Sequence, residues 1–105
     1  MTHKLPEIKT LYNRLKASAK KRDIEFSLTV PELCELSYPL TCPIFGMKLE
    51  FNRDCYKDNS YSIDRRDNMI GYHIDNIIVV SYRANQLKSN ATNEELKMLS
   101  DFYNS

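Results

Sequence analysis

The chain is poor in the residues that build several common kinds of functional site. Only two glycines occur in 105 residues, which leaves little room for a glycine-rich phosphate loop. Three cysteines, Cys34, Cys42 and Cys55, are an odd number without a CxxC pair, so a disulfide framework is not expected. No apolar run approaches the length of a membrane span, and no signal peptide is expected after Met1. These absences predict a cytoplasmic protein with reduced thiols and no membrane partner.

The charges are nearly balanced in number but unevenly distributed. Fifteen Lys and Arg stand against 14 Asp and Glu. Residues 1–22 hold seven basic side chains and one acidic one, a net +6, and the remainder holds eight basic and thirteen acidic ones, a net −5. A basic block suits a polyanion, most commonly nucleic acid, and it is also typical of a solvated helix face. Within it, we expect Lys16, Lys20, Lys21 and Arg22 to contact nucleic acid.

The length fits one small domain, and the periodicity of the apolar residues predicts a mixed α+β fold. Two capping boxes, Thr29 with Glu32 and Thr92 with Glu95, mark expected helix starts. Glycine and proline place a tight turn at residues 42–46. The expected helices are 6–22, 29–36, 83–88 and one from residue 92, and the expected extended segments are 23–28, 47–51, 61–65 and 74–81.

Three short motifs follow one another in the second half of the chain: S-I-D-R-R-D at 62–67, G-Y-H-I-D-N at 71–76 and S-Y-R-A-N-Q-L-K at 81–88. They distribute a carboxylate, Asp64, and a carboxamide, Asn85, along a strand, strand, helix pattern. Carboxylate and amide oxygens are hard ligands that suit Mg²⁺, and Mn²⁺ is a possible alternative. The pattern therefore predicts a site for one divalent metal ion.

Neighbouring polar residues complete this expected site. Asn76 suits the orientation of a loop or of a catalytic group by hydrogen bonds. Arg83 and Lys88 lie within about one helical turn of Asn85 and are expected to contact phosphate.

Residues 41–103 resemble the HNH, or His-Me finger, endonucleases, most closely small phage-encoded members that read S-x-D-R-x-D, G-Y-x-x-x-N and S-x-R-A-N-x-L-K. The resemblance places Asp64 and Arg65 on the family's Asp-His pair, Asn76 on its central Asn, and Asn85 on its helical His or Asn.

The resemblance implies a ββα-metal, treble-clef-like finger with flanking helices, and metal-dependent hydrolysis of phosphodiester bonds in DNA. Residues 1–105 would form a single HNH-like nuclease domain. Residues 1–38 would be a basic helical extension, and residues 41–103 would hold the finger and the C-terminal helix.

Many family members bind a structural zinc through two CxxC pairs, and this chain lacks most of those ligands. Cys42 is present, but Phe45 stands at the position of its partner, and Ser81 and Ala84 replace the second pair. A tetrahedral zinc site cannot be closed with one ligand, so no structural zinc is expected. We expect the tight turn at residues 42–46, the zinc knuckle of the family, to be held by packing of Cys42, Ile44 and Phe45.

The usual general base of the family is replaced by Arg65. Arginine stays protonated and cannot accept a proton, but it can bind phosphate or stabilise transition-state charge. Two titratable replacements are available, His73 and Asp67. If the hairpin turns around Met69, His73 lies across from Arg65 on the same face. His73 is therefore the expected base, on an assumed register.

Three functions compete at this point. The first is a metal-dependent DNA endonuclease. The second is a module that keeps the finger and binds DNA or a protein but has lost hydrolysis with its base. The third is a structural or inhibitory phage protein that binds no DNA.

Overall fold

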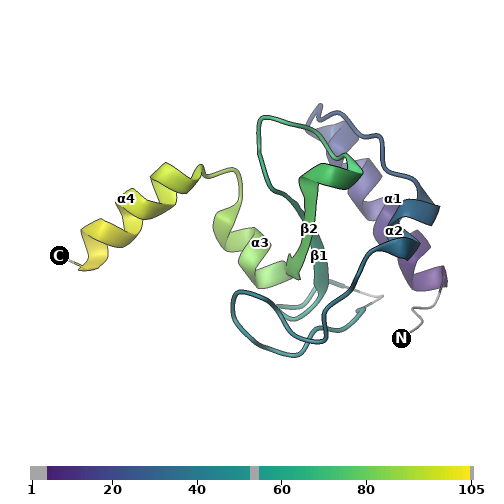
Figure 1. The fold of residues 1–105 in the computed structure, drawn as a ribbon, viewed down its shortest axis with the longest axis horizontal. Coiled ribbons are helices and arrows are strands. Elements are labelled where there is room, and N and C mark those ends of the chain that lie inside the picture. The colour runs from purple at the N-terminus through teal and green to yellow at the C-terminus, as the bar shows by residue number, and fades with distance from the viewer. Residues whose placement is uncertain (1–4, 53–54, 105) are drawn as a thin grey trace.

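A computed structural model describes residues 5–52 and 55–104 of the chain, so Lys4 of the basic block lies outside the described residues. The fold is α+β, with a two-stranded antiparallel sheet among helices (Figure 1). The elements, in chain order, are α1 (Leu5–Lys21), α2 (Val30–Glu35), β1 (Tyr61–Arg65), a 3₁₀ helix η1 (Ile74–Asn76), β2 (Ile77–Ser81), α3 (Tyr82–Lys88) and α4 (Asn93–Asn104).

Helix α1 forms where apolar residues recur at helical spacing. Ile8, Leu11, Leu15 and Ala19 are all buried, which places one face of the helix on the core. The opposite face carries the lysines. The predicted basic helix is confirmed over the described residues.

Both predicted capping boxes are present. The Thr29 hydroxyl accepts a hydrogen bond from the Glu32 amide at 3.3 Å, and the Glu32 carboxylate accepts one from the Thr29 amide at 3.0 Å. Thr92 and Glu95 make the same reciprocal pair at 3.1 and 2.9 Å. These local signals therefore position the starts of α2 and α4.

The sheet register corrects one prediction. Strand β1 coincides with the predicted segment 61–65, and Arg65 pairs with Ile77 across the sheet. His73 is therefore not opposite Arg65, and the assumed turn around Met69 is wrong. Residues 74–76 form η1 instead of the start of a strand, because the loop 66–76 folds back on the Asn76 side chain before β2 begins.

The turn at residues 42–46 is formed as predicted, but its packing is not. The Gly46 amide donates to the Cys42 carbonyl at 2.8 Å, and Gly46 has a φ of +79°, which glycine adopts without strain. Cys42 is buried, whereas Ile44 and Phe45 are 62% and 50% exposed. The expectation that Ile44 and Phe45 hold the knuckle by packing is wrong, because both lie on the solvent side of the turn.

The segments expected to be extended at 23–28 and 47–51 form isolated bridges in place of strands, one in the first segment and two in the second. Phe26 pairs with Tyr72, Lys48 pairs with Thr41, and Glu50 pairs with Ser60. The second segment thereby meets the start of β1, where the Tyr61 amide donates to the Glu50 carbonyl at 3.1 Å.

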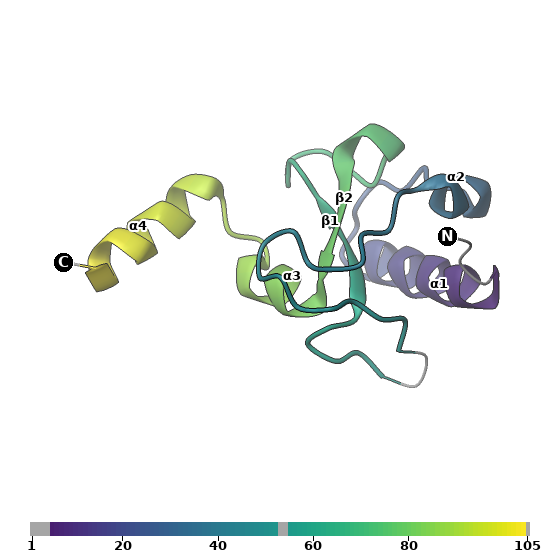
Figure 2. The same ribbon diagram turned by 60° about the horizontal axis from the view of Figure 1, so that its bottom comes forward.

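The hairpin lies between two groups of helices in both views (Figures 1 and 2). Helices α1 and α2 lie on one side of it, α3 lies on the other, and α4 extends away beyond α3. No residue of α4 is buried. In the described part of the chain, no helix is both long and apolar enough to cross a membrane.

Candidate functional site: a cleft along the edge of β1

Side chains alternate along β1 between the two groups of helices. Ser62 and Asp64 contact residues of α3 through hydrogen bonds, while Arg65 approaches the ring of Tyr72, as does Arg22 directly after α1. This alternation follows from the two-residue period of a strand. The adjacent residues Asp64 and Arg65 are thereby directed to opposite sides.

An open cleft of about 580 Å³ follows the edge of β1 that has no strand partner. Helix α1 and helix α3 form its walls, and residues 62–65 form its floor. The other lining residues are Arg14, Leu15 and Ser18 of α1, Arg22 directly after it, Tyr82, Asn85 and Gln86 of α3, and Tyr56, Asn68, Tyr72, Ser89 and Asn90 from loops.

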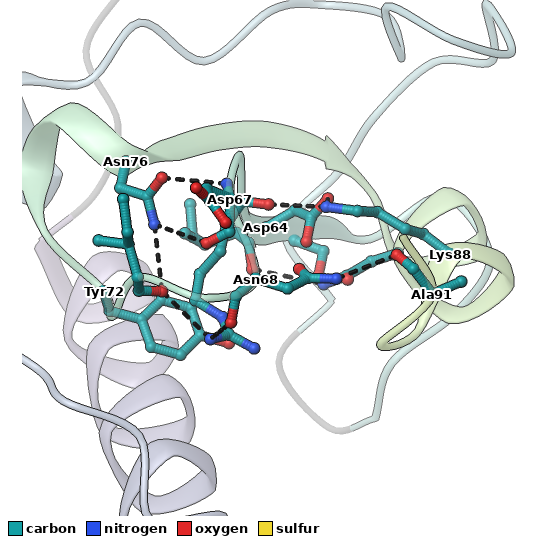
Figure 3. Close-up of polar contacts among 12 residues, drawn as sticks. Asp64, Asp67, Asn68, Tyr72, Asn76, Lys88 and Ala91 are labelled. Atoms are coloured by element: carbon teal, nitrogen blue, oxygen red, sulfur yellow. Dashed lines mark hydrogen bonds and ion pairs between the residues drawn. The ribbon is translucent and has the colours of Figure 1, made fainter. Parts of the chain in front are cut away.

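On the α3 side, the carboxylate of Asp64 is neutralised by Lys88. The Lys88 Nζ lies 2.9 Å from the Asp64 Oδ2 and donates a second hydrogen bond to the Arg65 carbonyl at 2.7 Å (Figure 3). The two side chains are only 13% and 19% exposed. Because solvent screens such a pair weakly, the attraction is stronger than in a surface salt bridge.

Asn85 is oriented by β1. Its amide nitrogen donates to the Ser62 hydroxyl at 2.7 Å and to the Ile63 carbonyl at 3.3 Å. With the nitrogen engaged in this way, the carbonyl oxygen is the atom available as an acceptor or ligand. The structure therefore brings Asp64 and Asn85, the two predicted metal ligands, to the same cleft.

On the α1 side, two guanidinium groups lie near the ring of Tyr72. The Arg65 guanidinium carbon is 5.4 Å from the ring centroid, and that of Arg22 is 5.9 Å from it. Arg22 also donates to the Tyr72 hydroxyl at 2.6 Å. Arg65 donates to the carbonyls of Asn68 and Ile70 at 2.7 and 3.1 Å.

A third arginine and two tyrosines also line the cleft. Tyr56 and Tyr82 stack with centroids 4.6 Å apart, and the Arg14 guanidinium carbon is 4.8 Å from the Tyr56 centroid. Burial raises the pKa of Tyr56 despite the opposing effect of Arg14, so the phenol keeps its proton at neutral pH.

Asn76 holds the loop that carries Tyr72. Its side-chain oxygen accepts from the Asp67 amide at 3.1 Å, and its nitrogen donates to the carbonyls of Asp67, Ile70 and Gly71 at 3.1, 3.2 and 2.9 Å (Figure 3). Asn76 is buried, and its bonds are those of a loop-orienting residue.

His73 lies outside the cleft, on a different face of the same loop. Its Nε2 lies 2.6 Å from a carboxylate oxygen of Glu25, and its Nδ1 forms a hydrogen bond with the Ser27 hydroxyl. The other expected base, Asp67, accepts a hydrogen bond from the Met69 amide at 2.9 Å. Neither is among the described residues that line the cleft.

The basic residues predicted to contact nucleic acid lie in three different environments. Arg22 and Arg65 line the cleft. Lys88 is bound to Asp64. The others, Lys16, Lys20, Lys21 and Arg83, are exposed and lie outside the described lining of the cleft.

Two cleft residues on α1 escaped the sequence reasoning, Arg14 and Ser18. They are spaced by four residues on the helix, and Arg22 follows at the same spacing directly after the helix ends. The spacing was visible in the sequence, but it indicates a cleft wall only once the neighbouring apolar face of α1 is known to pack on the core.

No protein-family model matches this chain, and no curated protein or solved structure matches it significantly. Within the described residues, no group of three or more His, Cys, Asp or Glu side chains is arranged to hold a metal ion. A metal site here would depend on asparagine and backbone oxygens as well as on Asp64.

Proposed function

We propose that this protein is a metal-dependent endonuclease of the HNH type that hydrolyses phosphodiester bonds in DNA. The observation that carries the proposal is the convergence of Asp64, Arg65 and Asn85 on one open cleft. These three residues belong to two motifs separated in the chain, and each corresponds to a family position through the resemblance at residues 62–88.

The order of the elements supports the finger part of the proposal. An antiparallel hairpin is followed directly by α3, which packs against it. The Cys42 thiol also lies 3.2 Å from the Ser81 hydroxyl. Cys42 and Ser81 correspond to positions of the two zinc-binding pairs in the resemblance, so their contact is the one that a zinc-less finger would make.

The donor set of the α3 side fits a hard divalent cation. The Asp64 carboxylate requires a positive charge beside it, which Lys88 supplies in the structure. A Mg²⁺ or Mn²⁺ ion would be held by Asp64 and Asn85 and would neutralise charge on the phosphate oxygens. Asp64 and Asn85 would orient the scissile phosphate, and Arg65, which β1 directs away from Asp64, would contact the DNA backbone. Asn76 would keep the loop after Arg65 in position.

Plasmid cleavage tests this proposal. Purified full-length protein is incubated with supercoiled plasmid and Mg²⁺ or Mn²⁺, and wild type is compared with Asp64→Ala. Because loss of metal-assisted charge stabilisation is worth several kcal/mol, we expect the rate to fall by roughly a thousandfold. Asp75→Ala removes an exposed carboxylate from η1, outside the cleft, and serves as the matched control. Equal cleavage by wild type and Asp64→Ala would contradict the proposal.

A binding module without hydrolysis is the second candidate, and two observations favour it. Lys88 already neutralises Asp64, and the described lining of the cleft has no histidine to act as a base. This candidate predicts salt-dependent DNA binding that survives Asp64→Ala and is accompanied by no nicking with either metal.

A further inference from the structure

On the α1 side of the cleft, two arginines carry positive charge for which the described residues provide no carboxylate counter-ion. Arg22 and Arg65 both approach Tyr72, and neither forms a salt bridge with a carboxylate in the described part of the chain. Two like charges close to one ring repel each other, and an anion bound to both would relieve that repulsion. This arrangement differs from the α3 side, where Lys88 neutralises Asp64.

Both guanidinium groups are held in place before any ligand arrives. Arg65 uses one terminal nitrogen for the carbonyls of Asn68 and Ile70, and Arg22 uses one for the Tyr72 hydroxyl. A guanidinium has five N–H donors, so each arginine keeps further donors for a ligand. Immobilisation before binding lowers the entropic cost of the contact.

The chemistry of the ligand follows from these donors. Planar guanidinium groups form paired, charge-assisted hydrogen bonds with phosphate oxygens. We propose that Arg22 and Arg65, positioned by Tyr72, form a subsite for a phosphate group of the nucleic acid other than the one that is cleaved. Because the alternation of β1 directs Arg65 away from Asp64, this phosphate is not the one beside the proposed metal ligands. The inference rests on the proposed function for the identity of its ligand.

A phosphate titration tests the subsite without requiring cleavage. Inorganic phosphate is added to ¹⁵N-labelled full-length protein in metal-free buffer with a chelator, and the arginine side-chain Nε–H signals are followed by NMR. We expect the Arg22 and Arg65 signals to shift along one saturable curve, while the signal of Arg66, which is exposed outside the cleft, stays nearly constant. Unchanged Arg22 and Arg65 signals, or an equal shift of Arg66, would overturn the proposal.

DNA binding by variants tests whether the two arginines act together. Anisotropy of a fluorescent DNA duplex is measured in chelator at several salt concentrations. We expect Arg22→Gln to weaken binding about tenfold and to lower the salt slope by about one. Arg66→Gln removes the same charge outside the cleft and should keep the wild-type slope.

Two further variants separate a shared subsite from separate contacts. Tyr72→Phe keeps every charge but frees Arg22, so affinity should fall severalfold at a nearly unchanged slope. Arg22→Gln combined with Arg65→Lys should cost less than the sum of the single changes, because both hold one phosphate. Strict additivity would overturn the shared subsite.

The outcomes distinguish this inference from the proposed function. Phosphate-dependent shifts without plasmid cleavage would retain the subsite and reject the nuclease. Cleavage abolished by Asp64→Ala but unaffected by Arg22→Gln would retain the nuclease and reject the subsite.

Discussion

The two sides of the cleft meet at β1 but neutralise their charges differently. On the α3 side, Asp64 and Lys88 form a partly buried pair at 2.9 Å, which leaves little net charge. On the α1 side, Arg22 and Arg65 approach the same tyrosine without a carboxylate partner among the described residues.

Under the proposed function, this difference would let one strand serve two kinds of ligand. A cation that binds on the α3 side must compete with Lys88 for Asp64. An anion that binds on the α1 side meets donors that are already oriented. The contrast predicts that variants on the two sides affect metal binding and phosphate binding separately.

The largest expected effect on stability comes from Asn76→Ala. The change removes four hydrogen bonds and leaves backbone groups of the loop 66–76 without their partner. We expect the free energy of unfolding in urea to fall by about 3 kcal/mol. Because this loop carries Tyr72, the α1 side should lose phosphate affinity as well. Asn13→Ala, on the exposed face of α1, is the control, and a similar loss there would show that the effect is not specific to the loop.

Gly71→Ala should act on the α1 side through sterics. A methyl group at residue 71 would collide with the carbonyl oxygen and the Cβ of Glu25, so the chain before Tyr72 must shift. Such overpacking costs about 2 kcal/mol. Calorimetry should show this loss together with weaker phosphate binding and unchanged metal binding.

Gly46→Ala provides the matched glycine change. Residue 46 has open space around it but a φ of +79°, so only backbone strain of about 1 kcal/mol is expected. If this variant weakened phosphate binding as much as Gly71→Ala, the steric explanation would be wrong.

Lys88→Met tests the α3 side. Without the ammonium, Asp64 becomes an uncompensated, partly buried carboxylate, and we expect a loss of about 1.5 kcal/mol in metal-free buffer. Added Mn²⁺ should restore more stability than it does in wild type, because the competing cation is gone. Lys97→Met breaks the exposed pair with Asp101 and should cost only about 0.4 kcal/mol, with no gain in metal response. An unchanged Mn²⁺ affinity in Lys88→Met would contradict the competition.

The smallest expected effect concerns α4, which belongs to neither side. Met98 and Phe102 are each 71% exposed, so replacing both by glutamine should change stability by less than about 0.5 kcal/mol. Leu11→Ala on the buried face of α1 should cost about 3 kcal/mol in the same assay. A large loss from the α4 changes would mean that this helix packs on the domain in solution.

The helices could be predicted from the sequence because their signals are local. The capping pairs at Thr29 and Thr92 each act over four residues, and α1 buries the residues that its periodicity selects. The convergence of Asp64 and Asn85 was also predicted, from motif spacing. Amphipathic spacing does not determine docking, however, since α1 is packed and α4 buries no residue.

The position of His73 could not be predicted in the same way. It depends on how the loop 66–76 folds, and that loop is organised by the Asn76 side chain and by contact with Glu25. Glu25 is distant along the chain from this loop, and the hydrogen bonds of Asn76 follow neither a helix nor a strand period, so no local pattern predicts these contacts.

By itself, the sequence determined the helix starts, the extent of β1, the buried face of α1 and the residue types available for chemistry, because these depend on interactions within a few residues. Only the tertiary structure decided the pairing of Arg65 with Ile77, the ion pair of Asp64 with Lys88 and the choice of Arg22 over the neighbouring lysines. These depend on contacts between distant segments, and a shift of one residue in the register of β1 would direct every side chain of the strand to the opposite side.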